Sequence, residues 1–179
     1  MEKEIKLKEL FSQSRIKRRV QKVAHSINSD YKNKVPILIG ILNGSFIFFA
    51  DLIRELEIDC EVDFMKVSSY KRHKSQGLVS LVSNLSSNIK GRDVIIVEDI
   101  IDSGLTINYL INLINESYPS SIAVATLLFK KEVAQLNFTP EYVGFEIPQD
   151  YVVGYGLDYD QKMRNLKSIK ILDKLDIIK

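Results

Sequence analysis

The chain has 179 residues, of which 45% are hydrophobic and 27% charged, with a formal net charge of +2. This profile is typical of one soluble globular domain, and the nearly balanced charge argues against a general nucleic-acid-binding protein. Cys60 is the only cysteine, which excludes an intrachain disulfide. The N-terminus is no secretory signal, and no apolar run approaches the roughly 20 residues that span a bilayer. We therefore expect a cytoplasmic protein that binds neither membranes nor nucleic acid.

The N-terminal part of the chain predicts a helix followed by a strand and a second helix. Apolar residues at helical spacing predict the first helix, and they are Ile16, Val20, Val23, Ala24 and Ile27. The short apolar run 35–42 predicts a buried parallel strand that ends in a turn at 43–45. Residues 46–56 have the length and apolar content of a helix.

The rest of the chain predicts strands that alternate with helical and irregular segments. Residues 60–67 predict a strand, in which Val62 and Phe64 alternate with acidic residues, and the polar, basic segment 68–77 predicts a loop. Further strands are predicted at 79–82, 94–97, 122–129, 142–147 and 169–172, with a helix from Leu105 to Ile114. This alternation predicts an α/β fold with a mostly parallel, twisted sheet flanked by helices. Ligands of such sheets bind beyond the carboxyl ends of the strands.

Residues 94–106 carry the strongest functional signal. Glu98 and Asp99 follow a buried apolar run, where an unpaired charge is costly, and ionised carboxylates suit the hydroxyls of a ribose. An Asp-Ser-Gly string at 102–104 then opens a helix with Thr106 in its first turn, so that N–H groups and hydroxyls form a phosphate cradle. Together these features indicate a ribose 5-phosphate site. The alternative is an ordinary strand and helix, with the Asp or Ser of the string as N-cap.

This segment closely resembles the motif that binds phosphoribosyl pyrophosphate (PRPP) in type I phosphoribosyltransferases. Other segments resemble hypoxanthine-guanine phosphoribosyltransferases, from about residue 16 to about residue 170. The resemblance implies the type I phosphoribosyltransferase fold in a single domain over 1–179. Its core would comprise about 30–145, and a small hood would comprise about 1–30 and 146–179. A homodimer or homotetramer is also implied.

The resemblance further implies roles for individual residues. PRPP ribose and 5-phosphate would be bound by Glu98, Asp99, Asp102, Ser103, Gly104, Leu105 and Thr106. Pyrophosphate would be bound by Leu42, Asn43, Gly44, Ser45 and Arg164, with a cis peptide between the first two. The purine would be bound by Lys130, Tyr151, Val152 and Asp158, under a lid that begins at Ser69 and Tyr70. Mg²⁺ would be bound by Glu98, Asp99 and Asp158, and Asp102 would be the general base.

The implied reaction transfers the 5-phosphoribosyl group from PRPP to hypoxanthine, and also to guanine, with release of pyrophosphate. Asn43 departs from the pattern, because many family members have lysine there, and the lid is unusually basic at 71–74. Lys130 taken alone would be interpreted as a surface lysine, so its role depends on the resemblance. Two alternatives stay open: a PRPP-responsive regulator without catalysis, and a transferase that prefers xanthine.

Overall fold

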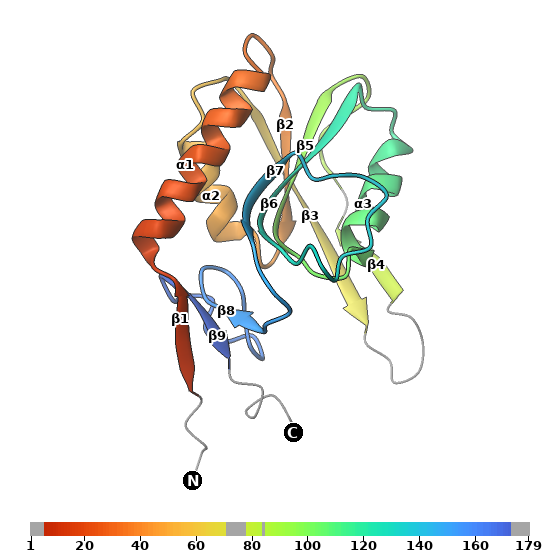
Figure 1. Cartoon of the computed structure of the whole chain (residues 1–179). Coiled ribbons are helices and arrows are strands. Elements are labelled where there is room, and N and C mark those ends of the chain that lie inside the picture. The colour runs from red at the N-terminus through yellow and green to blue at the C-terminus, as the bar shows by residue number, and fades with distance from the viewer. Residues whose placement is uncertain (1–5, 71–77, 84, 173–179) are drawn as a thin grey trace.

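The computed structural model describes residues 6–70, 78–83 and 85–172, which form three helices and nine strands in two sheets. The six-stranded sheet has the order β4-β3-β2-β5-β6-β7. Its strands are β2 (Ile37–Leu42), β3 (Glu61–Tyr70), β4 (Leu78–Ser83), β5 (Asp93–Ile101), β6 (Ser121–Phe129) and β7 (Tyr142–Glu146). All neighbours are parallel except β4, which pairs antiparallel with β3 (Figure 1). The predicted α/β class is confirmed.

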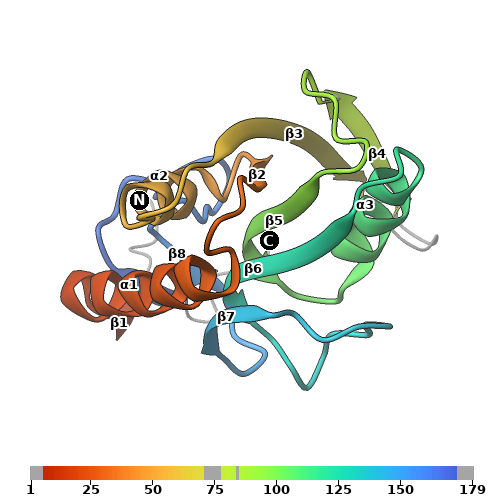
Figure 2. The ribbon, with the colours of Figure 1, turned by 90° about the horizontal axis from the view of Figure 1, so that it is seen from above.

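Helices cover both faces of this sheet, with α1 (Gln13–Asp30) and α2 (Phe46–Arg54) on one side and α3 (Leu105–Asn115) on the other (Figure 2). Side chains of successive strand residues point to opposite faces of the sheet, so the central strands contribute to two hydrophobic cores. Leu38 packs in the core under α1 and α2, whereas its neighbours Ile37 and Ile39 pack in the core under α3. This explains why β2 is an uninterrupted apolar run.

The predicted helical face of α1 is confirmed. All five apolar residues predicted for it are buried, and they are Ile16, Val20, Val23, Ala24 and Ile27. Ser12 is the N-cap, and its hydroxyl accepts a hydrogen bond from the Arg15 N–H at 3.4 Å, which satisfies one free donor of the first turn. The helix is therefore held by burial along one face and by a capped start.

Strand β3 is present, but the apolar residues that alternate with its acidic residues are not the buried ones, although this alternation suggested that they would be. Val62 and Phe64 are 47% and 39% exposed, whereas Asp63 is only 7% exposed. Burial alone would raise the pKa of Asp63, but its carboxylate accepts N–H groups from Ser87, Phe64 and Ser86, which lower the pKa. A buried acid is tolerated because the backbone supplies the partners that water would have supplied.

A second, three-stranded sheet has the order β1-β9-β8 and is antiparallel throughout. It consists of β1 (Leu7–Phe11), β9 (Ile169–Leu172) and β8 (Val152–Val153). Only β9 was predicted, because Lys8 and Glu9 interrupt the apolar residues of β1 and β8 has only two residues. Phe11 of β1 stacks on Phe145 of β7 with ring centroids 4.0 Å apart, which attaches this sheet to the larger one.

Candidate active site

The carboxyl ends of the parallel strands meet at one edge of the six-stranded sheet, next to the three-stranded sheet (Figure 1). Residues 42–45 follow β2, residues 102–104 follow β5, and Lys130 follows β6 at this edge. The prediction of a loop over 68–77 is wrong for residues 68–70. They are the end of β3, where Ser69 pairs with Val79 and Tyr70 pairs with Leu78. The rest of that predicted loop, residues 71–77, lies outside the described residues.

The acid pair lies inside β5, since the strand continues beyond its apolar run to Ile101. Glu98 is 9% exposed, and its Oε2 has no hydrogen-bond partner. Burial, and then the charge of Asp99, raise the pKa of Glu98 well above its ordinary value. Burial also raises the pKa of Asp99 to about 6, although the N–H of Ile100 donates to its Oδ1 at 3.0 Å. A buried Glu98 beside a half-buried Asp99, with one oxygen of the pair lacking a donor, is costly to the free protein and well suited to a hydroxyl-bearing ligand.

The loop after β2 lies directly against this acid pair. A Cβ on Gly44 would fall 1.7 Å from Asp99 Oδ2, so only glycine fits between the loop and the carboxylate. The peptide bond between Leu42 and Asn43 is cis, as the resemblance implied. Ser45 is fully buried, and both its hydroxyl and its N–H donate to the Ile41 carbonyl. Ser45 therefore shapes the loop, and its donors already have a partner.

The loop after β5 opens α3 with Gly104 as N-cap, at a φ of 89°. This overturns the assignment of Asp102 or Ser103 as N-cap, although Ser103 Oγ accepts a hydrogen bond from the Leu105 N–H at 3.4 Å. Gly104 has no room for a side chain, because a Cβ would lie 2.8 Å from the Gln135 carbonyl oxygen. A cavity of about 200 Å³ opens here, lined by Glu98, Ile100, Ile101, Asp102, Ser103, Gly104, Thr106 and Ile107.

Lys130 and Asp102 form an ion pair across the ends of β5 and β6. Lys130 Nζ lies 3.0 Å from Asp102 Oδ2, and the lysine is only 7% exposed, whereas the aspartate side chain is 58% exposed. The interpretation of Lys130 as a surface residue is therefore wrong. The buried ammonium is stabilised by a carboxylate that solvent and ligands can still reach.

Asp158 and Arg164 also pair with each other, in the segment between β8 and β9. Arg164 Nη2 lies 2.8 Å from Asp158 Oδ1, and Arg164 Nη1 donates to the Gly156 carbonyl at 2.8 Å. Both charges act on the pKa of Asp99, which places them beside the acid pair. Tyr151 is 40% exposed and meets the ring of Tyr159 edge-on at 5.9 Å.

Val152 is buried in β8, next to the exposed ring of Tyr151. The predicted residues thus fall into three neighbouring groups. The loop after β2 meets β5 at Asp99, the ends of β5 and β6 meet at the Lys130–Asp102 pair, and Asp158 pairs with Arg164 in the last segment.

Sequence reasoning missed one contact near the site, between Tyr155 and helix α2. The Tyr155 hydroxyl donates to Asp51 Oδ2 at 2.6 Å, and Asp51 also pairs with Arg54. A cavity of about 420 Å³ lies beside them, between α1, α2 and the segment near residue 166. It is larger than the cavity at Asp102, but neither Glu98 nor Asp102 lines it, so we place the chemistry at the smaller one. The flanking glycines at 154 and 156 were the available sequence signal for Tyr155.

The described residues contain neither a cluster of metal-binding side chains nor a membrane-spanning helix. Residues 6–70, 78–83 and 85–172 contain no group of three or more His, Cys, Asp or Glu side chains arranged to hold a metal ion. Within the same ranges, no helix has the length and apolar character needed to cross a membrane.

Comparison with known proteins identifies the family. The model of the phosphoribosyl transferase domain matches residues 6–160. The hypoxanthine-guanine phosphoribosyltransferase of Bacillus subtilis is 42% identical over 166 residues, which cover 92% of each chain. That of Dictyostelium discoideum is 40% identical, covering 88% of this chain and 90% of the relative.

A solved structure shows the same relationship. The crystal structure of a hypoxanthine-guanine phosphoribosyltransferase from Bacillus anthracis superimposes with a TM-score of 0.89 at 40% identity, covering 95% of this chain and all of the other. With a matching domain model, close relatives over most of the chain and the same fold, this chain belongs to the phosphoribosyltransferase family.

Proposed function

We propose that the chain is a hypoxanthine-guanine phosphoribosyltransferase, which converts hypoxanthine and PRPP to IMP and pyrophosphate in purine salvage, and guanine to GMP. The relatives of this name, which match nearly the whole chain, support the assignment. The observation that carries it is the cavity at the start of α3, which Glu98 and Asp102 line, with Asp99 next to Glu98 in β5 and Lys130 paired with Asp102. Sugar hydroxyls, phosphate and base would each meet groups of matching chemistry there.

At the ribose end, Glu98 and Asp99 would accept hydrogen bonds from the two sugar hydroxyls. Glu98 Oε2 is a buried acceptor without a partner, so a ribose hydroxyl would relieve part of the cost of burial. The 5-phosphate would lie at residues 102–106, where Ser103 and Thr106 offer hydroxyls and α3 offers its free N–H groups. These groups hold the sugar while its bond to pyrophosphate breaks.

At the purine end, the Lys130–Asp102 ion pair would open to receive the base. Lys130 would donate to the 6-oxo oxygen, and Asp102 would accept the proton at N7 as the new bond to the sugar forms. Tyr151 would stack on the ring, and the backbone of Val152 would bind the opposite edge. Adenine has an amino group at position 6, which would leave the buried ammonium without an acceptor and so reject this base.

At the leaving-group end, pyrophosphate would contact residues 42–45 and Arg164, whose planar guanidinium binds two phosphate oxygens at once. Phosphoribosyltransferases use Mg²⁺ with PRPP, and the residues present fit it. Among the described residues Glu98, Asp99 and Asp158 do not form a three-ligand cluster, but Mg²⁺ typically takes only one or two carboxylates together with substrate oxygens. When bound, the ion supplies positive charge that neutralises the departing pyrophosphate.

Several broader features belong to this proposal. Residues 1–179 would form one domain with a core over about 30–145 and a hood from the two terminal parts. Ser69 and Tyr70 would begin a lid over PRPP. The enzyme would work in the cytoplasm as a homodimer or homotetramer. Apolar side chains left partly exposed on α2 and β3 support self-association, and they are Phe46, Val62 and Phe64.

Initial rates with hypoxanthine, guanine, xanthine and adenine at fixed Mg-PRPP test the proposal, with product formation followed by ultraviolet absorbance. We expect turnover of hypoxanthine and guanine and negligible turnover of adenine. Faster turnover of xanthine than of hypoxanthine would favour the xanthine transferase. Binding of PRPP without turnover of any base would favour the non-catalytic regulator.

A further inference from the structure

Tyr155 has an unusual backbone conformation at the junction of the two sheets. Its φ is 52°, between Gly154 at 94° and Gly156 at 101°, so a bulky residue lies in the left-handed region between two glycines. Such a conformation is unfavourable for a side chain with a Cβ and persists only where surrounding contacts hold it. The ring is buried at 6% exposure, and its hydroxyl reaches Asp51 on α2 at 2.6 Å.

The backbone around Tyr155 is bonded to the segment that carries Arg164. Tyr155 N–H donates to the Leu166 carbonyl at 2.8 Å, and Gly156 N–H donates to the Arg164 carbonyl at 2.9 Å. The Arg164 side chain returns a hydrogen bond to the Gly156 carbonyl at 2.8 Å and pairs with Asp158. A shift of the Tyr155 backbone would therefore move the Arg164 guanidinium and the Asp158 carboxylate with it.

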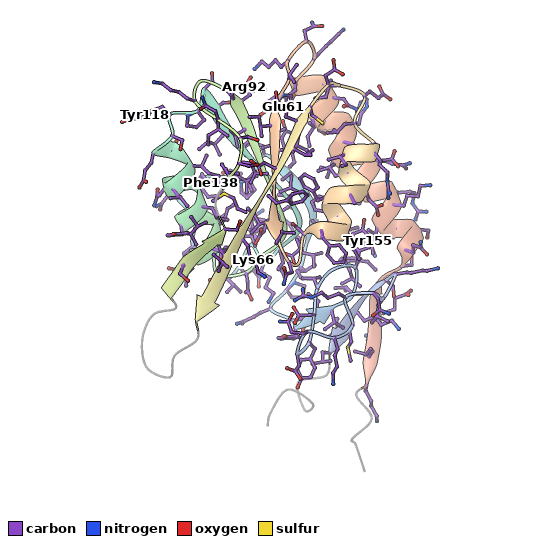
Figure 3. All side chains as sticks on the ribbon, turned by 180° about the vertical axis from the view of Figure 1, so that it is seen from behind. Glu61, Lys66, Arg92, Tyr118, Phe138 and Tyr155 are labelled. Carbon is purple, nitrogen blue, oxygen red and sulfur yellow. The ribbon has the colours of Figure 1, made fainter. Side chains whose placement is uncertain are left out.

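The same backbone touches the loop after β2. A Cβ on Gly156 would lie 2.1 Å from the Gly44 carbonyl oxygen, and Gly44 in turn lies against Asp99. Helix α2 begins immediately after this loop and carries Asp51. The Tyr155–Asp51 hydrogen bond thus joins α2, which follows the loop, to the turn after β8, where Tyr155 is labelled in Figure 3.

We propose that Tyr155, through its hydrogen bond to Asp51, is a positioning residue that sets the spacing between the loop at 42–45 and Arg164. This inference rests on the proposed role of these two elements in binding the pyrophosphate group of PRPP. Tyr155 touches no reacting atom. Its effect is to keep two separate phosphate-binding elements at the spacing that one pyrophosphate group requires.

The cavity of about 420 Å³ beside the pair strengthens this interpretation. Asp51 and Tyr155 line it together with Ile47 and Leu166, so packing on that side is incomplete. Where side chains do not fill the space between two elements, a directed hydrogen bond supplies a constraint that packing on that side does not. Removing the hydroxyl should therefore let the elements shift while the ring remains in its place.

The test is Tyr155→Phe, with Tyr142→Phe as matched control. Tyr142 is also a buried tyrosine whose hydroxyl donates to an aspartate on a helix, Asp30 at 2.8 Å, but it lies away from the loop. Tyr155→Phe should raise KM for PRPP, and for pyrophosphate in the reverse reaction, about tenfold, as expected for the loss of one hydrogen bond to a charged group. KM for hypoxanthine should rise much less, since Lys130 lies at the end of β6, where it pairs with Asp102 and does not contact the Tyr155–Asp51 pair. Tyr142→Phe should lower the unfolding midpoint about as much as Tyr155→Phe does. It should leave KM for PRPP, pyrophosphate and hypoxanthine unchanged.

A double-mutant cycle adds an independent readout. Asp51→Ala should raise KM for PRPP as Tyr155→Phe does, and the double variant should be no worse than either. Arg54→Gln, which keeps the Tyr155 bond and removes only the Asp51–Arg54 ion pair, should leave KM unchanged.

Two outcomes would overturn the inference: an unchanged KM for PRPP in Tyr155→Phe, or equal increases for PRPP and hypoxanthine. The rate of the unmodified chain with hypoxanthine is measured first. If the unmodified chain shows no turnover of hypoxanthine, this counts against the proposed function. If it is active but Tyr155→Phe leaves KM for PRPP unchanged, this counts against the positioning role alone.

Discussion

Replacing Asp99 by asparagine should stabilise the free protein while impairing its use of PRPP. The side chains are nearly the same size, and the amide oxygen can still accept the Ile100 N–H that Asp99 accepts at 3.0 Å. What changes is the charge, which burial makes unfavourable. The variant therefore separates the cost of the acid pair to folding from its value in binding.

The magnitude follows from the pKa of Asp99. Raising it from an ordinary 3.8 to about 6 corresponds to about 3 kcal/mol of unfavourable ionisation in the folded chain. Solvent that reaches the half-buried carboxylate reduces the expected gain to about 2 kcal/mol. The sign depends on pH. Above about 6 the acid is ionised in both states and the full cost is present, whereas below 3.8 it is protonated in both states and the cost disappears.

Urea unfolding at pH 8, 6 and 4 measures this effect, with the exposed Asp59→Asn as control. Asp99→Asn should gain about 2 kcal/mol at pH 8 and progressively less as the pH is lowered to 4, and the control should change little at any pH. The kcat/KM of Asp99→Asn for PRPP should fall at least tenfold, because the amide is a weaker acceptor for a ribose hydroxyl than the carboxylate is. A loss of stability at pH 8, or a gain independent of pH, would refute the reasoning.

Three further outcomes are expected from the same site. Asp102→Asn should lower kcat about 100-fold or more with little effect on PRPP affinity, because it removes the proton acceptor; full activity would exclude Asp102 as base. Lys130→Ala should raise KM for hypoxanthine at least tenfold, and an unchanged KM would contradict its role at the 6-oxo group. Treatment with EDTA should abolish turnover and added Mg²⁺ should restore it, so metal-independent activity would refute the assignment of Mg²⁺.

Local patterns were sufficient to predict most of the large sheet. Helical spacing identified the buried face of α1, and continuous apolar runs identified β2, β5 and β6, because elements buried on one or two faces leave a periodic signal. Strands β1 and β8 left no such signal. Leu7 of β1 pairs with Leu172 of β9, so that strand exists only once the two ends of the chain meet.

The buried polar groups were not predictable from pattern. Asp63 is buried because backbone N–H groups of Ser86 and Ser87 reach it, and nothing in the alternation of β3 reveals those partners. The same holds for Lys130, which is buried against Asp102. Resemblance to a family predicted Lys130 as a site residue, but only the fold shows its charge partner.

The candidate site shows the same limit. The string at 98–106 could be interpreted directly, since its residues are adjacent in the chain and their chemistry is local. The Tyr155–Asp51 pair joins residues 104 positions apart, whereas the Arg164–Asp158 pair lies within the irregular segment between β8 and β9. Neither contact leaves a signal in composition, periodicity or spacing.

A crystal structure of the protein with bound IMP tests the central claim most directly. The account predicts the ribose hydroxyls within hydrogen-bond distance of Glu98 and Asp99, and the 5-phosphate at the N–H groups and hydroxyls of residues 102–106. The base should lie between Tyr151 and the separated Lys130–Asp102 pair. A nucleotide bound elsewhere, or a complex in which Glu98 and Asp99 make no contact with the sugar, would contradict it.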